Sequence, residues 1–348
     1  MKVSINCSPI GAAYGGGSGF IKNLSDYLLS KNHEVYYDLN CNDLDIILII
    51  DPRNIKSFNN YSLSEIIRYL KFKNSQTIVI HRINECDERK NTKFMNKKLR
   101  VCNYLADHTV VISNYLKTLN IFYKKNNFIS TIYNGSDNKI FNTIKRNKLS
   151  LKRFKPSVFN IVTHHWSPNY MKGHDIYFYL DELCGQRKWK GKIKFTYIGN
   201  LPNNLNYKNT KILKPLYGSK LSKRLQQNDI YITASNNDPG PSHHLEGALC
   251  GLPILYKKSG GIPETAKGYG LMFNNKYDFE KKLNELIDNY NNYKNKMSNF
   301  PYTKEKMCND YLKLFKHILK NKKKYYAARK EKSNFYDDLK ILLKIRVF

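Results

Sequence analysis

Two carboxylates, Asp238 and Glu246, stand eight residues apart in a segment with strong turn and helix signals. Turn-forming residues occupy 236–240. A helix is predicted at 241–250, because proline suits a first helical turn and Gly251 follows as a stop. The N-terminus of a helix offers unpaired N–H groups to an anion such as phosphate. A carboxylate beside a phosphate is useful if it accepts hydrogen bonds from hydroxyls, so this segment predicts a site for a sugar or nucleotide.

Two predicted strands flank the acidic segment and must position it. Residues 229–233 alternate apolar and polar side chains like a half-buried strand, and 253–256 form a second apolar run. Strand, loop, helix and strand together make the unit in which ligands bind outside the carboxyl end of a strand. Taken alone, the two acids also fit a simpler interpretation, a solvated loop residue and a glutamate on a helix surface.

A glycine-rich turn stands near the N-terminus, where residues 11–19 follow a predicted strand at 2–7 and open a predicted helix. Such a turn lets backbone N–H groups approach a phosphate closely. The glycines do not fit the spacing of a dinucleotide-binding fingerprint well. A flexible turn is therefore the alternative interpretation.

Polar residues follow two further predicted strands. His81 closes a buried strand at 77–81 and opens a run of polar residues, which indicates a functional loop, although a lone histidine is more often structural. Lys172 precedes Gly173 in the loop after a strand at 158–163. An ammonium fixed at such a place suits an anion such as phosphate. A surface lysine is the alternative interpretation.

The spacing Asp238-x7-Glu246, followed by Gly251-Leu-Pro and Gly260-Gly-Ile-Pro-Glu, resembles the acidic block of retaining glycosyltransferases, family 4 in particular. The resemblance covers residues 1–290. It implies an α/β fold of the GT-B type, in which two doubly wound Rossmann-like domains face a cleft. Aspartate at the first acidic position departs from the glutamate of that family.

The resemblance implies a role for each candidate residue. Glu246 binds the ribose of the donor nucleotide, and Lys172 binds its diphosphate. His81 and Asp238 orient the donor sugar. The remaining donor-binding candidates are glycines and serines from four loops, Gly16, Gly17, Ser18, Gly199, Gly240 and Ser242.

An arginine about five residues before the phosphate-binding lysine is common in the family. This chain has Ser167 there, next to Trp166, and neither side chain is charged. Arg82 or His165 can supply the second positive charge, unless the diphosphate is held differently. No metal site is expected at His164 and His165, because adjacent side chains point apart on a strand end and no matching set of ligands stands nearby.

The sequence predicts two domains, 1–150 and 151–300, followed by C-terminal helices at 301–348. The first domain is expected to hold the acceptor and the glycine-rich loop, and the second to bind the nucleotide-sugar donor. Residues 142–156 are basic and lose their apolar rhythm, which is typical of a linker. The C-terminal helices are expected to cross back onto the first domain. Contact of this basic tail with a membrane surface is the alternative.

The charge balance is strongly basic, with 59 Lys plus Arg against 28 Asp plus Glu and a formal net charge of +31. Such a surface attracts phosphates of any kind. Lys, Asn, Ile, Tyr and Phe are abundant together, as an A/T-rich genome encodes by default, and no nucleic-acid-binding motif accompanies them. The charge alone is therefore not evidence for nucleic-acid binding.

Cysteine usage and hydropathy bear on location. Seven scattered cysteines without a Cys-x-x-Cys pair indicate reduced thiols in a cytosolic environment. No secretion signal or membrane-spanning stretch is visible. The sequence therefore predicts a cytoplasmic protein, with peripheral membrane contact through the tail as the exception.

The predicted function is transfer of a sugar from a nucleotide-sugar donor to an acceptor hydroxyl of a glycan or glycoconjugate, with the anomeric configuration retained. Neither a metal nor another cofactor is expected, since Lys172 and helix amides carry the charge. An epimerase or phosphorylase of the same fold is one alternative. A non-catalytic basic protein that binds nucleic acid or a membrane is the other.

Overall fold

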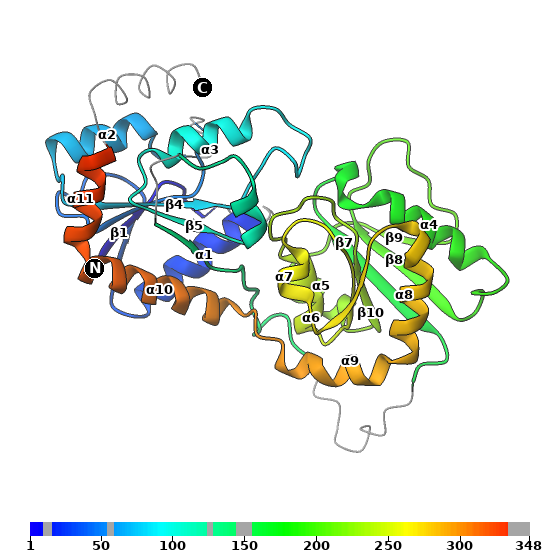
Figure 1. Ribbon diagram of the computed structural model, residues 1–348. Coiled ribbons are helices and arrows are strands. Elements are labelled where there is room, and N and C mark those ends of the chain that lie inside the picture. The colour runs from blue at the N-terminus through cyan, green and yellow to red at the C-terminus, as the bar shows by residue number, and fades with distance from the viewer. Residues whose placement is uncertain (10–15, 54–58, 124–127, 144–154, 333–348) are drawn as a thin grey trace. The chain divides into compact units, whose positions relative to one another are not determined.

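The computed structural model describes residues 1–9, 16–53, 59–123, 128–143 and 155–332. The chain forms two compact units, which Figure 1 shows as separate sheets with their own helices. The N-terminal unit comprises Met1–Asp87, Asn91–Tyr133 and Glu305–Phe348, and the C-terminal unit comprises Glu88–Lys90 and Asn134–Lys304. Apart from the short segment Glu88–Lys90, the chain changes unit near residues 134 and 305, where the sequence predicted boundaries near 150 and 300.

The N-terminal unit is built on a six-stranded parallel sheet with the strand order β2-β1-β3-β4-β5-β6. Its strands are β1 (Lys2–Ile5), β2 (Glu34–Tyr36), β3 (Ile46–Ile49), β4 (Ile78–Ile83), β5 (His108–Val111) and β6 (Ile129–Thr131). The four consecutive apolar residues of β3 are all buried. This is the pattern of a parallel strand that is covered on both faces.

Successive side chains of each strand point to opposite faces of this sheet, and helices cover both faces. Ile46 and Leu48 share a core with α1 and α10. Ile47 and Ile49 share a second core with α2 and α3. The helices of the unit are α1 (Gly16–Leu29), α2 (Leu63–Phe72), α3 (Met95–Asn103), α10 (Lys304–Lys320) and α11 (Lys322–Lys332), with the 3-10 helix η1 (Asn114–Thr118).

The last described helices pack on the N-terminal unit. Tyr311 of α10 lies edge-on to Phe20 of α1, with ring centroids 5.1 Å apart. Arg329 of α11 forms an ion pair with Asp107, the residue before β5. The chain therefore returns to its first unit after passing through the second. The helix predicted around residues 339–344 lies outside the described residues.

A second six-stranded parallel sheet forms the C-terminal unit, with the order β12-β11-β10-β7-β8-β9. Its strands are β7 (Phe159–His165), β8 (Ile193–Gly199), β9 (Lys211–Leu213), β10 (Ile230–Thr233), β11 (Ile254–Lys257) and β12 (Gly270–Phe273). Its helices are α4 (His174–Gly185), α5 (Gly218–Leu225), α6 (His243–Leu249), α7 (Ile262–Ala266), α8 (Lys276–Asp288) and α9 (Tyr290–Lys296), with the 3-10 helices η3 (Tyr170–Lys172) and η4 (Met297–Asn299). Ile161 packs with α4 and α8, whereas its neighbour Val162 packs with α5 on the opposite face.

Each sheet reverses its strand order once. In the N-terminal unit β1 lies between β2 and β3, and in the C-terminal unit β7 lies between β8 and β10. The strand that follows the central strand in the sequence therefore lies on one side of it, and a later strand lies on the other side. In α/β proteins ligands bind outside the carboxyl ends of the strands at this point. The predicted fold class, two doubly wound parallel sheets, is confirmed.

Candidate functional site

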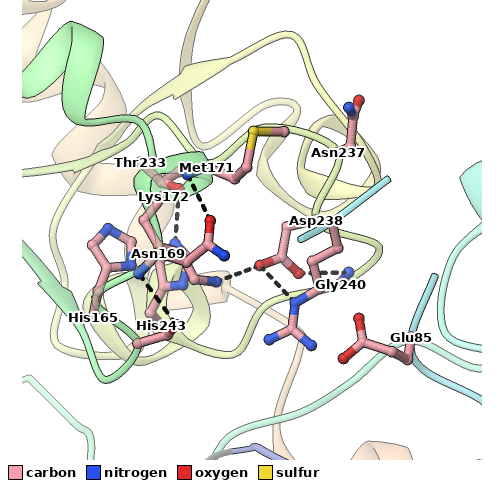
Figure 2. A network of polar contacts seen from close by, with 12 residues as sticks. Glu85, His165, Asn169, Met171, Lys172, Thr233, Asn237, Asp238, Gly240 and His243 are labelled. Atoms are coloured by element: carbon pink, nitrogen blue, oxygen red, sulfur yellow. Dashed lines mark hydrogen bonds and ion pairs between the residues drawn. The ribbon is translucent and has the colours of Figure 1, made fainter. Parts of the chain in front are cut away.

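Polar side chains gather where the strand order of the C-terminal sheet reverses. β7 ends at His165 and β10 ends at Thr233. Lys172 lies in the turn that follows β7, and Asp238 lies in the loop that follows β10. Figure 2 shows these two side chains facing each other, with His165 and His243 close to the lysine. The cation and the acid that the sequence singled out separately therefore meet.

Asp238 holds two cations on one carboxylate oxygen. Nζ of Lys172 lies 2.7 Å from Oδ2 of Asp238, and Nε of Arg89 lies 3.6 Å from the same oxygen. Burial acts to raise the pKa of Asp238, but the positive charges of Lys172 and Arg89 outweigh it and lower the pKa to about 2. Two cations and one anion leave this group of three with a net positive charge. Such a group suits an anionic ligand such as phosphate.

Glycine is required in the turn that presents Lys172. Gly173 has a φ of +97°, in the left-handed region that side chains disfavour. A Cβ at this position would also overlap the carbonyl oxygen of Ala234, just after β10. The turn is tied to the same loop by the N–H of Asn236, which donates to the carbonyl oxygen of Met171 at 2.8 Å. The Lys-Gly pair therefore holds Lys172 against the end of β10.

The Gly-Gly-Ile-Pro-Glu turn fixes the loop of Asp238 in a similar way. The N–H of Gly261 donates to the carbonyl oxygen of Asp238 at 2.9 Å. Gly260 has a φ of +60°, and a Cβ there would overlap the backbone of Asp238. The N–H of Asn237 donates to Oγ of Ser259 at 2.8 Å. This turn therefore positions the acid through its backbone.

Neutral imidazoles surround the ammonium of Lys172. His165 and His243 are buried, with ring centroids 4.5 Å apart. Burial, together with the positive charge of Lys172, holds both pKa values well below the usual range. Nε2 of His165 lies 2.7 Å from the hydroxyl of Tyr177, and Nε2 of His243 lies 2.8 Å from Oγ1 of Thr233. The histidines therefore add hydrogen-bonding groups but no charge.

The second cation of the site comes from a residue that the sequence did not single out. The sequence offered Arg82 and His165, but His165 is neutral for the reason above. The guanidinium of Arg82 stacks over the ring of Phe20 in the N-terminal unit, 3.7 Å from its centroid. Arg89 contacts Asp238 instead. No local signal distinguishes Arg89 from the other basic residues of the polar run that follows β4.

Glu246 has one carboxylate oxygen in use and one free. Its Oε2 lies 2.8 Å from Nε2 of His164, at the end of β7. Within the described parts of the chain no hydrogen bond is made to Oε1, and the side chain is 21% exposed. The free oxygen is thus available to a hydroxyl group. The sequence considered His164 only as a metal ligand and missed it as the partner of Glu246.

The helix that carries Glu246 begins later than the sequence predicted. α6 spans His243–Leu249, so Pro241 precedes it and Ser242 is its N-cap residue. The side chain of Ser242 makes no capping hydrogen bond. Proline is as compatible with the last loop residues as with the first turn, which explains the difference. Because this helix is short, the positive charge of the site comes from Lys172 and Arg89 rather than from helix amides.

Two glycines among the predicted donor-binding residues lie at the same edge of the sheet. Gly199 ends β8 with a φ of +146°, and a Cβ there would overlap the carbonyl oxygen of His165. The carbonyl oxygen of Gly240 accepts a hydrogen bond from Nδ2 of Asn134 at 2.7 Å. Close strand packing accounts for Gly199. Contact of either residue with a donor stays a prediction.

His81 lies within a strand of the N-terminal unit. β4 extends two residues beyond the strand that the sequence predicted, and His81 is paired with Ile49 of β3 and Thr109 of β5. The imidazole is fully buried, and neither ring nitrogen has a hydrogen-bond partner among the residues that the structure describes. Burial lowers its pKa to about 3, so the ring is neutral. Its contact with the donor sugar stays a prediction.

Gly16, Gly17 and Ser18 form the first turn of α1. The rest of the glycine-rich turn, residues 10–15, lies outside the described residues. A Cβ at Gly17 would meet no other atom within 4 Å. The fold itself therefore does not require glycine at this position, and an approach of this turn to a phosphate stays a prediction.

All seven cysteines are free. In the described ranges no group of three or more His, Cys, Asp or Glu side chains is arranged to hold a metal ion. No helix in those ranges has both the length and the apolar character needed to span a membrane.

Comparison with known proteins places this site in a family context. Residues 184–304 match a family model described as glycosyl transferases group 1, a stretch that includes Asp238 and Glu246. No curated protein sequence matches the chain. The structure is similar to sucrose-phosphate synthase from Thermosynechococcus elongatus, with a TM-score of 0.65, 10% identity and coverage of 92% of this chain and 99% of that chain.

Two further solved structures have a similar fold. HepE from Anabaena, in complex with UDP-glucose, has a TM-score of 0.63 and 14% identity, with 91% of this chain and 99% of that chain covered. A glycosyltransferase from Rickettsia africae has a TM-score of 0.63 and 15% identity, with 92% and 99% covered. At such identities the likeness concerns the fold. The predicted resemblance to GT-B glycosyltransferases is confirmed.

Proposed function

We propose that this chain is a glycosyltransferase that moves a sugar from a nucleotide-sugar donor to an acceptor hydroxyl and retains the anomeric configuration. One observation carries the proposal: two cations converge on Asp238, and Glu246 offers a free oxygen, at the strand reversal of one sheet. A nucleoside diphosphate needs both features, since it has anionic phosphates and ribose hydroxyls. The match to glycosyl transferases group 1 supports this class of enzyme.

Lys172 and Arg89 bind the diphosphate of the donor. Both already converge on one buried oxygen of Asp238, so little rearrangement is needed before they share a phosphate oxygen. As the bond to the sugar breaks, negative charge builds on the leaving diphosphate. Cations that are fixed in advance stabilise that charge, and such electrostatic stabilisation is usually the largest contribution to catalysis.

Glu246 binds the ribose. A carboxylate is a hydrogen-bond acceptor only, and its partners are therefore groups such as the ribose hydroxyls. Hydrogen bonds to a charged acceptor are stronger than those between neutral groups. A single free oxygen at the edge of the sheet thus suffices to favour a ribonucleotide.

The donor sugar is assigned to Asp238, beside the cations that bind the diphosphate. The bond from the anomeric carbon to the phosphate oxygen breaks, and the acceptor oxygen forms its bond on the same face. The departing phosphate takes the proton of the acceptor hydroxyl, so no protein nucleophile is required. The acceptor is a hydroxyl of a glycan or glycoconjugate.

The full chain, incubated with UDP-, GDP- and ADP-sugars and candidate glycan acceptors, tests the proposal. Transfer with retained configuration, read by NMR of the product, and its loss in Glu246→Ala support it. UDP-glucose is the first donor to test, because a neighbour in fold, HepE, was solved with that compound.

The alternatives give different products in the same experiment. A rearranged donor sugar without transfer indicates an epimerase, and release of a sugar phosphate in the presence of inorganic phosphate indicates a phosphorylase. A basic binding protein gives neither product. Its affinity for nucleotides falls steeply with salt and does not respond to Glu246→Ala.

A further inference from the structure

The contact between His164 and Glu246 joins residues that are far apart in the sequence. Nε2 of His164 lies 2.8 Å from Oε2 of Glu246, and both side chains are largely buried, with 11% and 21% exposed. A carboxylate can only accept a hydrogen bond. The hydrogen of the imidazole therefore lies on Nε2, and Nδ1 is left as an acceptor when the ring is neutral.

Tyr231 supplies the hydrogen that Nδ1 needs. Its hydroxyl oxygen lies 3.0 Å from Nδ1 of His164. Burial raises the pKa of Tyr231 well above its usual range, so the hydroxyl stays protonated. It therefore donates a hydrogen bond to Nδ1. The same oxygen accepts the backbone N–H of His164 at 3.2 Å. The imidazole is thus held at both nitrogens, and one tautomer satisfies every hydrogen bond.

The helix that carries Glu246 is also seated on Tyr231. Gly247 follows Glu246 in α6, and a Cβ at Gly247 would overlap the ring of Tyr231. Only glycine allows this approach without a shift of the helix or of the ring. Tyr231 of β10 therefore sets the position of both partners of the hydrogen bond. The tyrosine hydroxyl holds the imidazole of His164, and the tyrosine ring holds the helix that carries Glu246.

We infer that His164 is a positioning residue that orients Glu246 so that Oε1 faces the ribose hydroxyls. The series of hydrogen bonds from Tyr231 through His164 to Glu246 then makes the site select ribonucleotides over deoxyribonucleotides. The inference rests on the proposed function, which places a ribose at Glu246. Without His164 the carboxylate is free to rotate about its side-chain bonds. Binding of a ribose hydroxyl must then also order the carboxylate, which costs conformational entropy, so the preference for ribose falls.

The test measures affinities of the full-length protein by calorimetry. The probes are UDP, GDP and ADP, the 2′-deoxy and 3′-deoxy forms of whichever binds best, and inorganic pyrophosphate, which has no ribose. The wild type is expected to prefer the ribonucleotide by about tenfold or more, the size of one hydrogen bond to a charged group. His164→Leu is expected to bring that ratio close to one and to leave the affinity for pyrophosphate within about twofold.

Conservative variants separate positioning from general damage. His164→Gln keeps an N–H donor and is expected to recover part of the ribose preference. Tyr231→Phe keeps the ring against Gly247 but loses the hydroxyl, and its preference is expected to lie between those of the wild type and His164→Leu. Thermal unfolding of each variant without ligand, together with unchanged pyrophosphate binding, shows that the fold and the phosphate site are intact.

The possible failures are distinguishable. If Glu246→Ala removes the ribose preference but His164→Leu does not, the inference is wrong and the proposed function stands. If the wild type binds the nucleoside diphosphate without preferring ribose, the inference is also wrong. If no nucleoside diphosphate binds the wild type, the proposed function fails and the inference fails with it.

Discussion

The two sheets of this protein reverse their strand order in the same manner, but the side chains at the two reversals differ in kind. Beside β1 and β3, Asn6 links the two strand ends. Its Nδ2 donates to the carbonyl oxygen of Asp51 and its Oδ1 accepts the N–H of Ile50, each at 2.8 Å. Nδ2 of Asn59 donates to the same carbonyl oxygen at 3.0 Å. These amides tie loops to one another.

Beside β7 and β10, the side chains instead leave capacity for a ligand. Lys172 and Arg89 converge on one oxygen of Asp238, and Glu246 keeps an oxygen free. The strand order identifies both places as possible binding sites. Asp51 and Arg53 beside β3 form an ion pair with each other, whereas the group around Asp238 carries an additional positive charge, and this difference decides between the two places. The nucleotide is therefore expected at the C-terminal unit. The predictions below test this difference between the two reversals.

The largest effect is expected from Lys172→Ala. Removal of the ammonium takes away a cation that stabilises the leaving diphosphate, so kcat/KM is expected to fall about 100- to 1,000-fold. Steady-state kinetics with the best donor measure this loss. Lys220→Ala, at an exposed lysine of α5, is the control and is expected to keep its activity within about twofold. Equal activities of the two variants contradict the role of Lys172.

Gly173→Ala tests how the fold presents that lysine. The new Cβ would overlap the carbonyl oxygen of Ala234 at a backbone φ of +97°, and the free energy of unfolding is expected to fall by about 2 kcal/mol or more. Urea unfolding measures the change. Gly191→Ala has a similar φ of +78° but open space around it, so a loss of only about 1 kcal/mol is expected there. Equal losses would mean that the overlap with Ala234 does not matter.

Arg89→Ala is expected to weaken binding of a nucleoside diphosphate about tenfold. This change is smaller than the loss of kcat/KM expected from Lys172→Ala, because the contact of Arg89 with Asp238 is longer than that of Lys172. Calorimetry measures the affinity at constant ionic strength. Arg187→Ala removes an exposed arginine of the same unit and serves as the matched control. An unchanged affinity in Arg89→Ala would leave Lys172 as the sole phosphate-binding side chain.

The buried histidines make stability depend on pH. Burial lowers the pKa of His174 to about 4 and that of His244 to about 3, and holds those of His165 and His243 well below the usual range. Below the ordinary value of 6.5 the unfolded chain therefore binds protons that the folded chain does not, so stability falls as the pH falls from 6.5 towards 4. Urea unfolding at several pH values measures this slope.

A single substitution tests the origin of that slope. In His244→Gln the slope is expected to be shallower by at most about 1.4 kcal/mol per pH unit, the contribution of one proton. Asn295→Gln alters an exposed residue of α9 and is expected to leave the slope as it is. Identical slopes in both variants contradict the assignment to His244.

The smallest effect is expected from Gly17→Ala in the N-terminal unit. The new methyl group meets no atom within 4 Å and lies in a helix, so the free energy of unfolding is expected to rise slightly, by less than about 1 kcal/mol. Donor affinity tests the role of the glycine turn. A loss of affinity without a loss of stability would assign a ligand to the N-terminal unit and weaken the contrast between the two reversals.

Much of the fold and part of the site could be predicted because their signals are local. Apolar runs placed β10 and β11 within about one residue. Lys172 was predicted from the resemblance of the Lys-Gly pair to a glycosyltransferase motif, and the structure places its side chain beside Asp238. Glu246 was predicted from its spacing to Asp238. The predicted start of α6 at Pro241 was wrong, because proline fits a first helical turn and the loop before it equally well.

The rest of the site depends on contacts between distant segments. Arg89 follows β4 in the sequence, yet it contacts Asp238 after β10. The alternation of apolar residues placed Tyr231 in a strand but did not show that its hydroxyl reaches His164 at the end of β7. Such contacts follow from the order of strands in the sheet, which no local pattern specifies.

A structure of the full chain with a bound nucleoside diphosphate tests the central claim most directly. The account predicts that the phosphates contact Lys172 and Arg89 and that the ribose hydroxyls contact Oε1 of Glu246, beside β7 and β10. A nucleotide bound beside Asn6 and Asp51, with Lys172 and Glu246 making no contact to it, would contradict the account.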